Sequence, residues 1–189
     1  MFRHNRRTEA VEFAVPALRL KVREVRRDSR LITRSKDGIW RYLTASPFRY
    51  DEWAPFAGRS DGYYKGQSPH GAFVKVIANK IARHNPKQLP YGSILIKENY
   101  GADSKTLMAI TVMYRTRGAN GQPWDPQNRD WYYVKYTPSG QVAFSPSGQV
   151  AFSPPEMGSK RLAGRVQSCI DCHSDAGSKD YVFLNDDLK

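Results

Sequence analysis

The chain has 189 residues, of which 40% are apolar and 12% aromatic, and it carries a formal net charge of +12 at neutral pH. This length suits one globular domain with a hydrophobic core and excludes two large domains. No apolar run approaches the ~18 residues of a membrane span, so we expect no transmembrane segment.

Half of the excess positive charge lies near the N-terminus. Residues 1–34 contain ten Lys and Arg side chains against four acidic ones. A basic arm can contact nucleic acid or anionic lipid, but a solvated and poorly ordered terminus is the simpler interpretation. We therefore expect a basic arm over residues 1–35, one globular domain over residues 36–189, and no nucleic-acid partner.

The first part of this domain is predicted to combine a helix with a loop. Residues 39–56 are rich in aromatic side chains, and the spacing of Trp40 and Leu43 predicts a helical stretch that Pro47 stops. Residues 58–69 are rich in Gly, Ser and Tyr, which predicts a loop.

A series of strands follows. Residues 73–78 are mostly apolar and β-branched, and Asn79 is a candidate cap for a short helix that ends before Pro86. Three further predicted strands, separated by loops rich in Gly, Asp, Pro and Asn, cover residues 93–99, 107–114 and 131–137. Strands joined by short loops favour an antiparallel sheet. The predicted class is therefore α+β, a single domain dominated by an antiparallel β-sheet with a few helices.

The C-terminal part contains a repeat and a last predicted helix. The octapeptide PSGQVAFS at residues 138–145 recurs unchanged at residues 146–153. Two copies are too few for a solenoid, which indicates a local duplication in a turn-rich loop or hairpin with little function of its own. A helix is predicted over residues 159–173, with one side formed by Leu162, Val166, Cys169, Ile170 and His173.

This last helix carries the string CIDCH, which contains the chain's only two cysteines, Cys169 and Cys172, followed by His173. The spacing is the one at which haem c is attached. Each thiol can form a thioether with a porphyrin vinyl group while the adjacent imidazole ligates the iron. The motif predicts one covalently attached haem c, with His173 as the iron ligand and the last helix as the attachment site.

A zinc site and a redox dithiol are the rival interpretations of this motif. Zinc normally takes four ligands, but the sequence has no second cysteine pair and no suitably spaced histidines. A thioredoxin-like dithiol belongs near a βαβ pattern and needs no histidine after its second cysteine. The sequence therefore favours haem.

Attachment of haem c also predicts the compartment. In bacteria haem is joined to this motif outside the cytoplasmic membrane, so we expect a periplasmic protein. The first residues, MFRHNRR, lack the continuous apolar stretch of a signal peptide. We therefore expect the export signal to have been lost, trimmed, or to lie upstream of this start.

The second axial position of the iron decides what the haem does. An electron carrier fills it with a strong ligand, whereas an enzyme or gas binder leaves it open. Neither Met nor His follows the CIDCH motif, so a sixth ligand has to be one of the upstream residues Met108, Met113, Met157, His70 and His84. Met108 and Met113 lie five apart in a predicted strand and point to opposite faces, and core packing is the expected role of both.

Several strings in this order resemble the cytochrome P-460 family. They are SPHGAFVKVIANKIA, LPYGSILIKENY, LMAITVM, RDWYYVKY and the late CIDCH followed by DYVF. The resemblance extends from about Trp40 to Phe183. It implies a β-rich monohaem c-type protein, usually a homodimer, that is exported to the periplasm. Members oxidise hydroxylamine, and the related cytochromes c′-β share the fold but bind nitric oxide.

In the enzymes of this family a lysine forms an additional covalent bond to the porphyrin, and the resemblance places it at Lys97 in the string ILIKE. The preceding residues, Ile94, Leu95 and Ile96, predict a partly desolvated amine with a lowered pKa, which favours the nucleophilic neutral form. The alternative is an edge-strand lysine that extends into water.

Other polar residues are weaker candidates. His70, in the SPHG turn, is a candidate distal proton shuttle or ligand, the alternative being a histidine that only bonds the backbone. Asp130 and Trp131 match the family's DW string, and we expect them to fix a loop and fill the core. Glu98 alternates to the face opposite Lys97, so it is not assigned as a base. The sequence identifies no acidic residue of a distal pocket.

The leading hypothesis is thus a periplasmic oxidoreductase with His173 as proximal ligand, an open distal site and Lys97 crosslinked to the porphyrin. The substrate is expected to be hydroxylamine or a similar small nitrogen species, with electrons passed to a separate redox partner. Two alternatives remain: a nitric oxide binder of the cytochrome c′-β type without the crosslink, and a simple electron-transfer cytochrome.

Overall fold

The computed structural model describes residues 36–45, 49–56, 62–67, 70–145, 159–177 and 180–183. The basic arm over residues 1–35, the second copy of the repeat and Met157 lie outside these residues.

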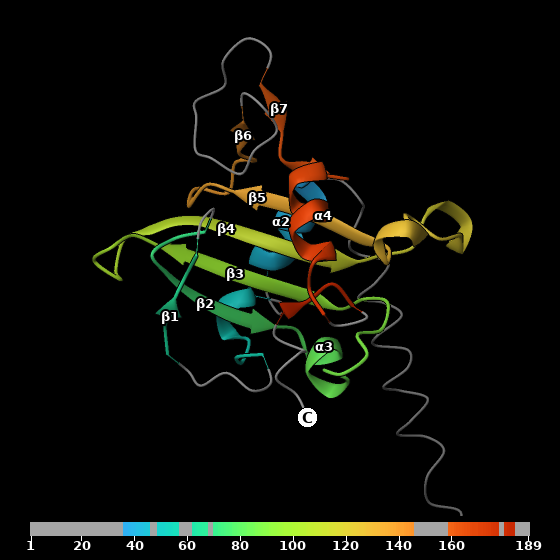
Figure 1. The fold of residues 1–189 in the computed structure, drawn as a ribbon, viewed down its shortest axis with the longest axis horizontal. Coiled ribbons are helices and arrows are strands. Elements are labelled where there is room, and N and C mark those ends of the chain that lie inside the picture. The colour runs from blue at the N-terminus through green and yellow to red at the C-terminus, as the bar shows by residue number, and fades with distance from the viewer. Residues whose placement is uncertain are drawn as a thin grey trace, which may run out of the picture.

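The centre of the domain is a six-stranded antiparallel sheet (Figure 1). Its strands lie side by side in the order β1 (Tyr64–Lys65), β2 (Phe73–Ala78), β3 (Ile94–Tyr100), β4 (Leu107–Arg115), β5 (Trp131–Tyr136) and β8 (Ala163–Gly164). Every neighbouring pair is antiparallel. The α+β class and the four long strands were predicted, and the structure confirms them. The short strand β1 lies where only a loop was expected.

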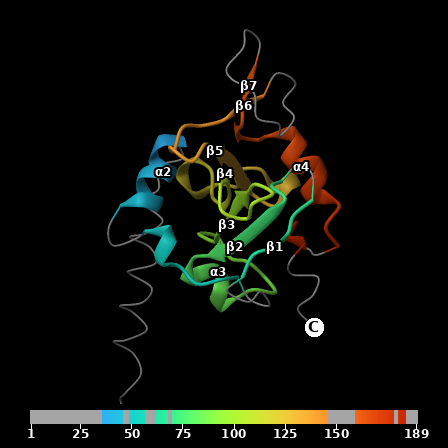
Figure 2. The same ribbon diagram turned by 90° about the vertical axis from the view of Figure 1, so that its left-hand side faces the viewer.

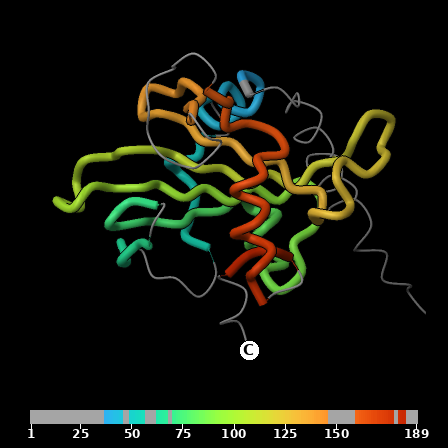
Figure 3. The backbone as a smooth tube through the Cα atoms, turned by 45° about the horizontal axis from the view of Figure 1, so that its top comes forward, coloured from blue at the N-terminus to red at the C-terminus, as the bar shows by residue number. Residues whose placement is uncertain are grey.

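Two helices cover opposite faces of this sheet. Figure 2 shows α2 (Lys36–Thr44) on one side and α4 (Gln167–Ser174) on the other, and in Figure 3 α4 runs across the strands. The smaller elements are α3 (Lys80–His84), the 3-10 helices η1 (Tyr50–Glu52), η2 (Ala119–Gly121) and η3 (Pro126–Asn128), and a two-stranded sheet of β6 (Phe144–Ser145) and β7 (Lys160–Arg161). Among the described helices, none has the length and apolarity needed to cross a membrane.

The alternation of side chains along each strand builds two cores. On β3, Ile94 and Ile96 are fully buried in the core on the α2 side. Leu95, between them, points to the other core, which Ile170 of α4 and the fully buried Trp131 of β5 share. Because side chains alternate across a strand, the apolar run that precedes Lys97 serves both layers at once.

The short helix α3 begins as the sequence predicted. The side-chain oxygen of Asn79 accepts hydrogen bonds from the backbone N–H groups of Ala82 (3.0 Å) and Ile94 (3.2 Å), and its amide donates to the carbonyl of Gly92 (2.8 Å). Asn79 therefore caps the helix and also ties it to the start of β3. The helix ends at His84, before Pro86, as expected.

The last helix is shorter than predicted. It begins at Gln167, and half of residues 159–166 lie in β7 and β8. The reason is that this segment bonds to the sheet: Leu162 donates to the carbonyl of Ala143 (2.9 Å) and accepts from the backbone N–H of Lys135 (3.0 Å). Leu162 and Val166 still join Ile170 in one core, so the predicted apolar side exists without a continuous helix.

The first copy of the repeat forms a turn followed by β6. Gly140 lies there at φ +83°, and a Cβ at this position would come within 2.2 Å of the Trp40 ring. A left-handed backbone and this close approach together require glycine. The first copy therefore packs on α2 and contributes nothing to the site described next.

Candidate functional site

A cavity of about 480 Å³ lies between the C-terminal end of α4 and the sheet. This volume falls in the range of about 300–1,000 Å³ that is usual for ligand and cofactor pockets. The strands, the β1–β2 region, α4 and the segment after it all contribute side chains. The lining residues are Tyr64, Lys65, Gly66, Gln67, His70, Val74, Val76, Leu95, Ile96, Lys97, Thr111, Met113, Cys172, His173, Val182 and Phe183.

The α4 wall of the cavity holds the CIDCH motif. Cys172 lines the cavity, and Cys169, one turn earlier, is half-buried and packs against the core beneath α4. Both thiols are free, and burial raises the pKa of the Cys169 thiol to about 11. Two free thiols thus lie one turn apart on α4, one of them at the cavity wall, which is the spacing that double thioether attachment needs.

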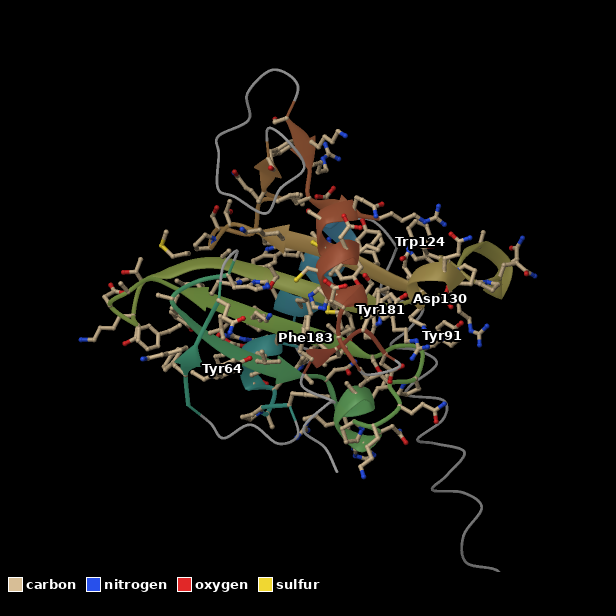
Figure 4. All side chains as sticks on the ribbon, in the orientation of Figure 1. Tyr64, Tyr91, Trp124, Asp130, Tyr181 and Phe183 are labelled. Atoms are coloured by element: carbon tan, nitrogen blue, oxygen red, sulfur yellow. The ribbon has the colours of Figure 1, made fainter. Side chains whose placement is uncertain are left out.

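The imidazole of His173 is held in one orientation. Its Nδ1 lies 2.9 Å from the backbone carbonyl oxygen of Tyr181, so Nδ1 donates and Nε2 keeps a free lone pair. The ring lies between Tyr133 and Phe183, with centroid distances of 5.6 and 5.8 Å, and Figure 4 shows Tyr181 and Phe183 near the end of α4. Burial is the main cause that lowers the pKa of His173 to about 4. The ring is therefore neutral at pH 7, the form in which histidine binds a metal.

Lys97 enters the same cavity from the sheet. It lies in β3, an interior strand, where it is half-buried and directly opposite Val76 on β2 and Thr111 on β4. Burial lowers the pKa of its amine to about 8. The edge-strand interpretation is therefore wrong, because both neighbouring strands are present and the side chain does not extend freely into water.

His70 lies at the cavity with a defined tautomer. The amide nitrogen of Asn99 donates to the carbonyls of Lys97 (3.0 Å) and Ala109 (3.2 Å), so its oxygen is the atom facing His70 Nδ1 at 3.1 Å. Nδ1 must then carry the proton, which leaves Nε2 as an acceptor. Burial, followed by the charge of Lys97, lowers the pKa of His70 to about 3. The ring does not merely bond the backbone, because its partner is a side chain.

The structure shows which of the described candidates for the sixth iron ligand reach the cavity. Met113 lines the cavity, whereas Met108 is 42% exposed, so the two do point to opposite faces. Core packing is confirmed for Met113 and wrong for Met108. His84 is exposed at the end of α3. His70 and Met113 are thus the described candidates that reach the cavity.

Acidic side chains are missing from the described part of the cavity wall. No Asp or Glu is among the lining residues. Glu98, as predicted, faces away from Lys97, and its carboxylate accepts a hydrogen bond of 2.9 Å from the Tyr100 hydroxyl. Asp130 and Trp131 also fill their predicted roles: Asp130 accepts from the backbone of Asp125 (2.7 Å), and Trp131 is fully buried in the core.

The sequence interpretation did not single out Lys135, which lies on the same side of the sheet as Lys97. Across the sheet Lys97 is opposite Thr111, and Thr111 is opposite Lys135. Lys135 is only 4% exposed and does not line the cavity. Burial lowers its pKa to about 8. Only the strand register reveals that these two lysines stand in one row.

Replacing Lys135 by methionine is expected to raise the free energy of unfolding by about 2 kcal/mol at pH 7. The pKa of Lys135 falls from 10.5 to about 8 on folding. The unfolded chain therefore binds more protons between these values, so the wild-type protein gains stability as pH rises through that window. The advantage of the variant should fade from pH 8 to pH 10.5, as measured by urea unfolding. An equal advantage at pH 7 and pH 10.5 would contradict this explanation.

The fit to haem rests on the donor set. A neutral imidazole with a free Nε2 and the Cys172 thiol border one largely apolar cavity, and the second free thiol, Cys169, lies one turn earlier on the same helix. Within the described residues, no three His, Cys, Asp or Glu side chains gather to hold a metal ion by themselves, as a zinc site would need. An α+β domain with this cavity and a C-x-x-C-H motif belongs to the class of c-type haem proteins.

Comparison with known families agrees with this class. The model of the cytochrome P460 family matches residues 47–184. The chain therefore belongs to the cytochrome P460 family, whose members bind haem c, and the predicted resemblance is confirmed. A search among curated proteins found no match.

Proposed function

We propose that this protein is a periplasmic monohaem c-type oxidoreductase that oxidises hydroxylamine or a similarly small nitrogen species. Cys169 and Cys172 would hold the porphyrin through two thioethers, and His173 Nε2 would ligate the iron. The bound haem supplies a redox centre that takes electrons from the substrate and passes them to a separate carrier. A basic protein suits an acidic redox partner, and family members are usually homodimers.

The observation that carries this proposal is the meeting of Lys97 with Cys172 and His173 in one cavity. The pKa of about 8 leaves a useful fraction of the Lys97 amine neutral and nucleophilic near pH 7. Formation of the crosslink would break an N–H bond of Lys97 and a C–H bond of the porphyrin ring and would form one N–C bond. The two protons and two electrons released would be accepted by an oxidant of the peroxide class.

His70 supplies a polar contact for the substrate. Oxidation of hydroxylamine releases protons together with electrons, so its N–H and O–H groups need an acceptor close by. The unprotonated Nε2 of His70 provides one, because Asn99 holds the proton on Nδ1. With a pKa of about 3, His70 accepts a hydrogen bond but stores no proton at neutral pH. Released protons therefore pass on to water.

One observation favours the second candidate, a nitric oxide binder of the cytochrome c′-β type. The described cavity wall contains no carboxylate to act as a base. Nitric oxide carries no proton to be removed, so a wall without acids suits it. A third candidate, an electron-transfer cytochrome, requires His70 or Met113 to fill the second axial position.

The deciding experiment combines the ferric and ferrous absorption spectra of the purified holoprotein with its intact mass and hydroxylamine turnover. We expect a strongly red-shifted ferrous Soret band, the mass of one attached haem and measurable turnover. An ordinary high-spin c-type spectrum without turnover would favour the nitric oxide binder. A low-spin spectrum that becomes high-spin in the His70→Ala protein would indicate the electron carrier, and a mass without haem would refute the proposal.

A further inference from the structure

The segment that follows α4 is fastened to the sheet by Asp180. Its carboxylate accepts the backbone N–H of Leu89 at 2.7 Å and pairs with Arg115 at 2.8 Å. Its backbone carbonyl accepts the indole N–H of Trp131 at 2.7 Å. Asp180 is 5% exposed and Trp131 is fully buried. Three bonds from three parts of the chain therefore fix one residue, and we call this set the Asp180 clamp.

The next residue, Tyr181, has an unusual backbone. Its φ is +60°, a left-handed conformation that costs a non-glycine residue free energy and persists only where the surroundings enforce it. The Asp180 clamp holds the chain on one side, and Val182, 4% exposed in the core, holds it on the other. The backbone carbonyl of Tyr181 is thereby directed at Nδ1 of His173, 2.9 Å away.

We propose that Asp180 is a positioning residue for His173, acting through the carbonyl of Tyr181. A hydrogen bond donated by the outer nitrogen of a metal-bound histidine fixes the ring and raises its basicity, which tunes the metal's reduction potential. Here the acceptor is a backbone atom whose direction depends on the Asp180 clamp. The inference rests on the proposed ligation of iron by His173.

The ion pair between Asp180 and Arg115 can be removed without removing the Asp180 side chain. In Asp180→Asn one carboxylate oxygen becomes an NH₂ group, which cannot pair with Arg115, while the remaining oxygen can still accept from Leu89. Arg115→Gln breaks the same ion pair from the other side and leaves Asp180 intact. Arg115→Gln also removes the hydrogen bond from Arg115 to the carbonyl of Leu89, so the effect that both variants share reports the ion pair.

Glu98→Gln is the matched control. It makes the same change from carboxylate to amide at a position that is 9% exposed, but Glu98 faces away from the cavity and bonds Tyr100. A loss of stability that all three variants share is then a general effect of replacing a buried carboxylate or its partner. A change in the properties of the haem iron that occurs only in the two variants of the Asp180 clamp shows the link to His173.

The experiment measures the iron–histidine stretching band of the ferrous holoprotein by resonance Raman spectroscopy, together with the midpoint potential. In Asp180→Asn we expect the band to move to lower frequency and the potential to rise. A weaker hydrogen bond from Nδ1 makes the His173 ring less basic, so Nε2 donates less electron density to the iron. Arg115→Gln should shift both in the same direction by less, and Glu98→Gln should leave both unchanged.

Two other results would overturn the inference in distinguishable ways. If the band and the potential in both variants of the Asp180 clamp equal those of the wild type, Asp180 is structural only, and the proposed function stands. Ligation by His173 predicts an iron–histidine band in the wild-type ferrous protein that is absent from His173→Gly. If no band behaves in this way, ligation by His173 is itself wrong.

Discussion

Replacing Lys97 by leucine is expected to return the ferrous Soret band to an ordinary c-type position and to lower hydroxylamine turnover by about 100-fold, the upper end of what losing a group that supports a metal centre costs. Lys97 is the half-buried amine of the cavity wall, whereas Lys65 of β1, which also lines the cavity, is exposed. Leucine fills a similar volume but provides no nucleophilic nitrogen. Absorption spectra, turnover and mass spectrometry of the haem-bearing peptides would measure the change.

Lys135→Met is the matched control for this variant. Lys135 lies in the same row of the sheet and its pKa is also lowered to about 8, but it does not line the cavity. Its replacement should leave the spectrum and turnover unchanged. If Lys97→Leu also leaves both unchanged, or if the wild-type peptide mass contains no lysine–haem bond, the crosslink is refuted.

Replacing both Cys169 and Cys172 by alanine is expected to yield a protein that carries no covalent haem. Each thiol can contribute one thioether, so the double variant has none, whereas a single variant retains one attachment at reduced yield. Intact mass after acid denaturation distinguishes these outcomes, because only covalently bound haem stays with the polypeptide.

The loss of haem in this variant should not follow from a collapsed fold. Cys172 is exposed and contributes little to the stability of the polypeptide, whereas Cys169 is half-buried against the core, so we expect the double variant to lose about 1 kcal/mol of stability and still fold. Ser174→Ala, on the same helix, serves as control, since Ser174 only donates to the carbonyl of Asp171 at the surface. Covalent haem at the wild-type level in the double variant would show that the motif is not the attachment site.

Local patterns in the sequence determined the elements that depend on nearest neighbours. Apolar and β-branched runs between turn-rich loops placed β2 to β5 to within a few residues, and Asn79 marked the start of α3. The CIDCH string by itself indicated the cofactor, because thioether attachment requires two thiols at this spacing. The predicted helix over residues 159–173 failed since its first half bonds to distant strands, which a helical apolar pattern cannot reveal.

The tertiary structure alone decided how the site is assembled. The tautomer of His70 follows from Asn99, 29 positions away, and the orientation of His173 follows from Tyr181, which Asp180, Arg115 and Trp131 hold in place. Such contacts depend on strand register and on where a loop returns to the sheet. A one-residue shift of β3 would turn Lys97 to the opposite face without changing its local sequence. The sequence therefore determined which groups are present, and the packing of distant segments determined which of them meet.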